Sequence, residues 1–108
     1  MVLINVKFFI RADKNVEWLV LAERYTSDVQ AEPGNVFFSI ARSLEDPQTY
    51  ICIEGFRDNE AGGEHMKQQH VSDFFAALPD IVSTRPHIIY VDTEAVSGFA
   101  EMGEVTPR

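Results

Sequence analysis

The sequence contains a single cysteine, few basic residues and no long apolar run. Cys52 alone excludes an internal disulfide and a cysteine-rich metal site. Nine Lys and Arg against seventeen Asp and Glu give a net charge of −8, which repels nucleic-acid phosphates and anionic membrane surfaces. No segment approaches the roughly 18 apolar residues of a membrane span, and Met1–Lys7 does not resemble a signal peptide. We therefore expect a cytoplasmic protein that binds neither nucleic acid nor membranes.

The composition is that of a globular protein, because 45% of the 108 residues are hydrophobic and 24% are charged. We expect a single domain over residues 1–108, with a core over 2–92 and a C-terminal tail over 93–108 that can contact a partner subunit. Eight Phe, three Tyr and one Trp are a large aromatic content for so small a chain. We infer that part of this aromatic surface is buried between subunits.

Hydrophobic periodicity predicts four strands and two helical regions. Apolar residues at helical spacing follow Asp13, which is a suitable N-cap for the first helix. The second helical region is weakened by Gly62 and Gly63, and Pro79 should end it. The expected elements are a strand over 2–11, a helix over 14–29, strands over 36–44 and 49–57, a helical region over 58–78, and a strand over 87–92.

The order βαββαβ predicts a ferredoxin-like α+β fold. Its antiparallel four-stranded sheet carries helices on one face only. The other face would expose a large apolar surface unless another molecule covered it. We therefore expect a homodimer in which two sheets pack face to face.

Glu54 and His65 are the candidate catalytic pair. Glu54 lies among apolar and aromatic residues of a predicted strand, so its carboxyl should be buried and in need of a partner. His65 lies two turns into the following helix and can fold back over that strand, where an acid and an imidazole can move protons. The alternative is a structural hydrogen bond between helix and strand. Asn5 can approach Glu54 and orient a substrate oxygen, or it can satisfy a backbone group.

His65 and His70 do not share one face of a straight helix. Five residues turn a helix by about 500°, which leaves the second histidine about 140° from the first. Zinc sites on a helix use the i, i+4 spacing, so we expect no metal here unless the glycine-rich helix bends between the histidines. A glycine-rich phosphate loop and a flavin motif are also absent, and we expect no cofactor.

Several motifs together resemble the antibiotic biosynthesis monooxygenase family. Its pattern EPGN-x-x-F is matched by Glu32–Phe38, and its DP dipeptide by Asp46–Pro47. A longer pattern, E-x-aromatic-x-D-x-x-A-x-x-x-H-x-x-x-x-H, is matched from Glu54 to His70. The resemblance covers about residues 2–92. It implies a dimeric α+β barrel of ferredoxin-like protomers, each with a pocket between helices and sheet.

The resemblance also implies a cofactor-independent monooxygenase that oxidises a small aromatic or quinol-type substrate with O₂. His65 would remove a phenolic proton while Glu54 holds its tautomer, and Asn5 or Ser39 would bind the substrate oxygens. Members that degrade haem pair a first-strand Asn with a helix Trp and a helix His, whereas the only Trp here, Trp18, lies in the first predicted helix. That tryptophan lines the pocket or packs in the core. The expected substrate-binding residues are Trp18, Phe38, Ser39, Phe56, His70 and Phe75.

Two other functions are compatible with the same residues. An isomerase or proton-transfer enzyme acting on a small phosphorylated keto-sugar-like molecule would use the same His and Glu. It would also need cations for the phosphate, for which Arg42, Arg57 and Lys67 are the candidates. A non-catalytic dimeric ligand-binding module would bury Glu54 and His65 together without an open cavity between helices and sheet.

Overall fold

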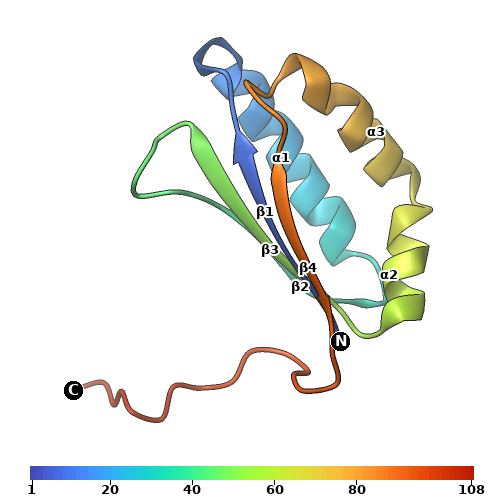
Figure 1. Ribbon diagram of the computed structural model, residues 1–108, viewed down its shortest axis with the longest axis vertical. Coiled ribbons are helices and arrows are strands. Elements are labelled where there is room, and N and C mark those ends of the chain that lie inside the picture. Colours follow the sequence, from blue (N-terminus) through green and yellow to red (C-terminus); the bar gives the residue numbers. More distant parts are fainter.

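The computed structural model describes residues 1–108 and contains a four-stranded antiparallel sheet with helices on one face (Figure 1). The strand order is β2-β3-β1-β4, which confirms the ferredoxin-like α+β fold. The elements are β1 (Val2–Phe9), a 3-10 turn (Ala12–Lys14), α1 (Asn15–Gln30), β2 (Asn35–Arg42), β3 (Thr49–Phe56), α2 (Asn59–Met66), α3 (Gln69–Ala77), a second 3-10 turn (Leu78–Asp80) and β4 (His87–Asp92).

Strand register decides which side chains face the helices. Ile4 of β1 pairs with Glu54 of β3 on one side and with Tyr90 of β4 on the other. Residues paired across neighbouring strands project from the same face, and the next residue along each strand projects from the opposite face. The central part of the helix-facing side is therefore apolar except for Glu54, and the charged residues Arg42 and Asp92 share this face only at the ends of their strands.

The core lies between this face and the helices. Trp18 of α1 is completely buried and packs against the rings of Phe8, Tyr50 and Phe74. Tyr25, two turns further along α1, stacks on Phe74 with ring centroids 3.8 Å apart. These aromatic contacts hold α1 and α3 against the centre of the sheet.

The second helical region consists of two helices. α2 ends at Met66 and α3 begins at Gln69, so the chain changes direction after the predicted weak point at the two glycines. Asp58 caps α2 by accepting a hydrogen bond from the Ala61 amide at 2.8 Å. The expected cap of the first helix is wrong, because Asp13 lies within a 3-10 turn and forms an ion pair with Arg11 instead.

Residues 93–108 form no helix or strand and extend away from the end of β4 (Figure 1). Their main aromatic contact is between Phe99 and Phe37 of β2, with ring centroids 4.7 Å apart. Within the whole chain, no helix has the length and apolar character required to cross a membrane.

Candidate functional site

The turn between α1 and β2 is fastened to the start of α2. The side-chain amide of Asn35 donates to the carbonyl oxygens of Phe37 in β2 and Gly55 in β3, at 3.0 and 3.2 Å. Gly34 lies so close to α2 that a Cβ at this position would collide with the Ala61 side chain. Glycine is required here for space, and Glu32, two residues earlier, contacts His65 of α2.

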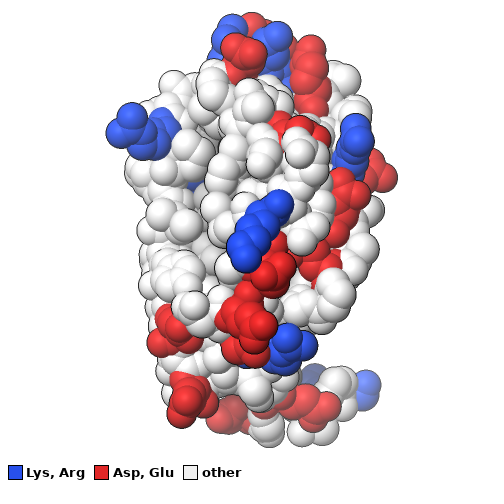
Figure 2. All heavy atoms as spheres, turned by 90° about the vertical axis from the view of Figure 1, so that its right-hand side faces the viewer, with Lys and Arg blue, Asp and Glu red and all other residues white.

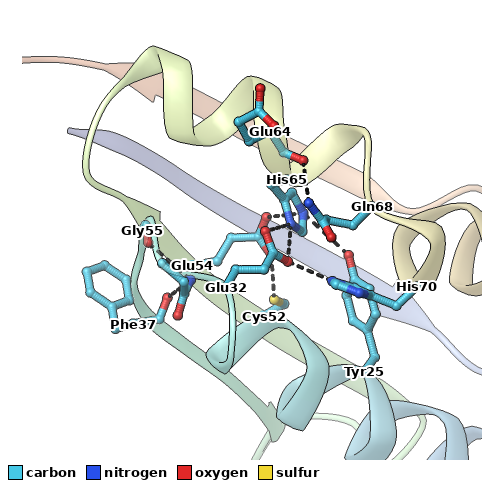
Figure 3. A network of polar contacts seen from close by, with 11 residues as sticks. Tyr25, Glu32, Phe37, Cys52, Glu54, Gly55, Glu64, His65, Gln68 and His70 are labelled. Atoms are coloured by element: carbon cyan, nitrogen blue, oxygen red, sulfur yellow. Dashed lines mark hydrogen bonds and ion pairs between the residues drawn. The ribbon is translucent and has the colours of Figure 1, made fainter.

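Glu32 contacts two imidazoles through one carboxylate oxygen. Its Oε2 lies 2.8 Å from Nδ1 of His65 and 2.7 Å from Nε2 of His70 (Figure 3). His65 belongs to the last turn of α2 and His70 to the first turn of α3. Because α2 and α3 are separate helices, the chain bends between the two histidines, which a straight helix would hold about 140° apart. The bend turns both imidazoles toward Glu32.

This contact favours one tautomer of a neutral His65 imidazole. An ionised carboxylate only accepts hydrogen bonds, so the facing nitrogens, Nδ1 of His65 and Nε2 of His70, carry the protons. In the neutral imidazole the free lone pair of His65 is then on Nε2, which lies 3.5 Å from the Tyr25 hydroxyl and 3.9 Å from Oε1 of Glu54. His65 and Glu54 thus meet as expected, but Glu32, rather than Glu54, holds the imidazole tautomer.

Glu54 is a buried acid, 7% exposed. Burial raises its pKa above the ordinary value, and the neighbouring His65 partly opposes that rise. The Cys52 thiol donates to Oε2 of Glu54 at 3.4 Å. Burial and the charge of Glu54 raise the pKa of Cys52 and of Tyr25 well above their ordinary values. Both groups therefore stay protonated at neutral pH, and Cys52 has no nucleophilic thiolate.

A cavity of about 550 Å³ begins at this cluster and lies between the sheet and the pair α2 and α3. Its wall is mostly apolar, and no Lys or Arg lines it. The lining residues with large exposed fractions mark its mouth between the two helices and β4: Met66, Phe75, Ile88 and Tyr90. The volume is within the range of pockets that bind small organic molecules.

The predicted site residues are divided between the two faces of the sheet. Glu54, His65, Phe56 and Phe75 line the cavity. The expectation that Asn5 approaches Glu54 is wrong, because Asn5 pairs with Ile53 and Ile89 and projects from the other face. Ser39 of β2 also pairs with Ile53 and shares that face.

Three further candidates lie beside the cavity without lining it; Trp18 and Phe38 are buried and His70 is partly buried. Trp18 packs in the aromatic core, the alternative that the sequence left open, and Phe38 packs edge-on against Tyr25 with ring centroids 5.5 Å apart. His70 lies behind His65 and contacts Glu32. None of the three touches the cavity in this structure.

Glu32 and Tyr25 both contact His65, and neither contact was predicted from the sequence, where Tyr25 was expected to pack in the core or to line a pocket. Glu32 could have been selected from the sequence. It is an acid immediately before Pro-Gly, it follows an amphipathic helix, and it belongs to a matched motif. Tyr25 lies on the apolar stripe of α1, where a core residue and a site residue have the same pattern.

The surface on the side of α2 and α3 is dominated by uncharged atoms, with acidic groups more numerous than basic ones (Figure 2). No broad basic patch interrupts this side. The view agrees with the overall charge of −8.

Comparison with known proteins gives both a family and a fold. The family model described as "Antibiotic biosynthesis monooxygenase" matches residues 1–77. A structure named as an antibiotic biosynthesis monooxygenase superposes with a TM-score of 0.79 at 17% identity, covering 86% of this chain and 98% of the other. No curated protein sequence matches significantly.

Two further structures show the same fold at similarly low identity. A conserved protein from Methanosarcina mazei Go1 has a TM-score of 0.80 at 17% identity, covering 86% of this chain and 92% of the other. Rv0793 from Mycobacterium tuberculosis has a TM-score of 0.80 at 18% identity, covering 88% and 98%. Because the family model spans most of the chain, this protein belongs to the antibiotic biosynthesis monooxygenase family.

Proposed function

We propose that this protein is a cofactor-independent monooxygenase that oxidises a small aromatic or quinol-type substrate with O₂. The observation that carries the proposal is the orientation of His65. With Nδ1 hydrogen-bonded to Glu32, a neutral His65 carries its free lone pair on Nε2, beside the mostly apolar cavity of about 550 Å³ that this residue lines. A base at the end of an apolar pocket suits proton removal from a flat, weakly acidic molecule. Family membership supports the same class of reaction.

The cavity favours this substrate class over the two alternatives. A phosphorylated molecule requires cationic partners, and the cavity wall contains no Lys or Arg. The nearby carboxyl of Glu54 would also repel an anion when ionised. A non-catalytic module of the kind considered above would have no open cavity beside the buried pair. An uncharged aromatic molecule needs no cationic partner and is not repelled by an ionised Glu54.

The first step of the reaction is proton transfer to Nε2 of His65 from a phenol or an activated CH₂ group. The substrate anion then gives one electron to O₂, and the resulting radical and superoxide combine to form a carbon–oxygen bond. No protein group changes its oxidation state in these steps, because the substrate supplies the electrons. The surrounding apolar wall excludes water from the reactive pair.

The second half of the reaction restores His65. The imidazolium returns its proton to the outer peroxide oxygen, the O–O bond breaks, and the second proton of the substrate carbon leaves with the hydroxide as water. For a CH₂ group between two rings the balance is R₂CH₂ + O₂ → R₂C=O + H₂O. Glu54, whose pKa is raised by burial, is placed to pass the second proton. The protonated Tyr25 hydroxyl is placed to donate a hydrogen bond near Nε2.

Oxygen uptake by the metal-stripped protein with chemically reduced naphthoquinols and anthrones tests the proposal. We expect uptake above the autoxidation rate in the wild type and a loss of at least about 100-fold in His65→Ala. The matched control is His87→Ala, because His87 lies on β4 away from the cavity. Equal rates for wild type, His65→Ala and buffer would overturn the proposal for these substrates.

We also propose that two copies associate through the sheet face opposite the helices. This face presents Phe37, Ile51, Ile53 and Ile89, and Ile89 is 65% exposed. An apolar sheet face of this kind is a poor surface to leave in water. The helices already cover the other face, so the second copy would pack on the uncovered side.

A further inference from the structure

We propose that Glu32, His65 and His70 form a binding site for a divalent transition-metal ion of the zinc class. The three side chains offer one carboxylate oxygen and two imidazole nitrogens, and these atoms all lie within 4.8 Å of one another. Two histidines and one carboxylate are a recurrent ligand set for such ions, with open positions left for water. This ion would be held on the side of His65 that faces away from the cavity.

The observed distances are close to those that an ion requires. Ligands at about 2.0–2.2 Å from one ion lie roughly 3.0 Å apart at right angles and about 3.4 Å apart in a tetrahedron. Oε2 of Glu32 is now 2.8 Å from Nδ1 of His65 and 2.7 Å from Nε2 of His70. The oxygen must therefore separate from each nitrogen by roughly 0.2–0.3 Å for the first geometry and roughly 0.6–0.7 Å for the second. Each imidazole must also release the proton that it now shares with Glu32.

The position of the cluster provides both rigidity and access. Glu32 is held by the turn at Gly34, and the side chains of Glu32 and His65 are 9% and 4% exposed. His70 is 22% exposed and borders a small surface hollow that also contains Asp28, Asp73 and Arg24. The two carboxylates attract cations to the hollow, and Arg24 opposes them. The ion can thus enter from this side without passing through the cavity.

Metal binding would reverse the role of His65. When an ion binds Nδ1, the imidazole proton is on Nε2. The Nε2–H group can then donate a hydrogen bond to a molecule in the cavity, but it cannot accept a proton. While the metal ion is bound, His65 therefore cannot act as the base. This consequence rests on the proposed oxygenase function, whereas the binding of the ion does not.

Calorimetric titration of the metal-stripped protein with Zn²⁺, in the absence of substrate, measures the binding directly. We expect one ion per chain, with affinity reduced at least about tenfold in Glu32→Gln and in His70→Phe. The phenyl ring keeps the aromatic contact of His70 with Tyr25 and removes only the ligand nitrogen. The matched control is His87→Phe, outside the cluster, which should bind as the wild type does.

Visible absorption with Co²⁺ distinguishes coordination by the cluster from loose association. Bands expected in the wild type should be lost in His70→Phe, and far-ultraviolet circular dichroism checks that this variant is folded. No Zn²⁺ binding by folded wild type would overturn the proposal, as would equal affinity in all variants. If oxygen uptake is found, Zn²⁺ should suppress it in the wild type. A protein without oxygenase activity that still binds Zn²⁺ through these residues would overturn only the proposed function.

Discussion

Oε2 of Glu32 lies 2.8 Å from Nδ1 of His65, although the two residues are 33 positions apart in the chain. One residue comes from a turn and the other from the end of a helix, and the contact determines which nitrogen of the imidazole faces the cavity. In Ser-His-Asp hydrolases, too, a carboxylate contacts Nδ1 of the catalytic histidine and orients its imidazole. Under the proposed function, Glu32 is a positioning residue and His65 is the group that would touch the substrate.

Glu32→Gln should lower kcat by about 10- to 100-fold with little change in KM. An amide can donate to Nδ1 as well as accept from it, so His65 is no longer confined to the tautomer with a free Nε2. KM should be preserved because Glu32 does not line the cavity. Steady-state oxygen-uptake kinetics measure both constants. Glu64→Gln on the exposed side of α2 is the control, and an unchanged kcat in Glu32→Gln would contradict the positioning role.

Gly34→Ala should destabilise the protein by about 1–3 kcal/mol, because the new methyl group overlaps the side chain of Ala61. The second variant Ala61→Gly should restore part of this loss when combined with Gly34→Ala. Urea unfolding of the two single variants and the double variant measures the coupling. Gly63→Ala is the control, since a Cβ there meets nothing within 4 Å and helical propensity should favour alanine. Strictly additive effects at Gly34 and Ala61 would show that the turn does not press on α2.

Glu54→Gln should remove a pH-dependent loss of stability. The folded pKa of Glu54 is raised, so between its ordinary value of 4.5 and the raised value the folded protein keeps a proton that the unfolded chain has released. Rising pH through this window therefore favours unfolding. The variant should be more stable than the wild type above this window, and this advantage should shrink toward pH 4. Urea unfolding at several pH values measures the difference. A difference independent of pH would show that Glu54 ionises equally in both states.

Ile89→Glu should raise the dissociation constant of the dimer at least tenfold, because two like charges would enter an apolar interface. Light scattering should give twice the chain mass of 12.2 kDa for the wild type and a mass near 12.2 kDa for the variant. Val16→Glu on α1 is the matched control, since Val16 is also exposed but lies on the helical side. A wild-type mass of 12.2 kDa at micromolar concentration would contradict the dimer.

The order and type of the elements could be predicted from the sequence because they depend on local periodicity. Alternation over β1 and 3.6-residue spacing over α1 are visible within about ten residues. The exact site where the second helical region breaks was not predicted. Gly62 and Gly63 lower helix propensity, yet both remain in α2 and the chain turns at Lys67 and Gln68.

The pairing of Glu54 with His65 could also be predicted, because a carboxyl in an apolar strand requires a partner and few polar side chains are available. The position of Asn5 on the opposite face of the sheet could not be predicted from the sequence. A shift of one residue in register transfers a side chain to the opposite face, and register depends on contacts between strands rather than on either strand alone. The structure pairs Glu54 with Ile4, so its neighbour Asn5 projects away from the site.

The sequence by itself determined the βαββαβ order, the buried acid and the histidine above it, because each follows from residue type and short-range spacing. Only the tertiary structure decided that Glu32 joins them. Its position depends on the close approach of Gly34 to Ala61 and on the change of direction between α2 and α3. Both are packing relations between segments far apart in the chain, and no pattern within one segment records them.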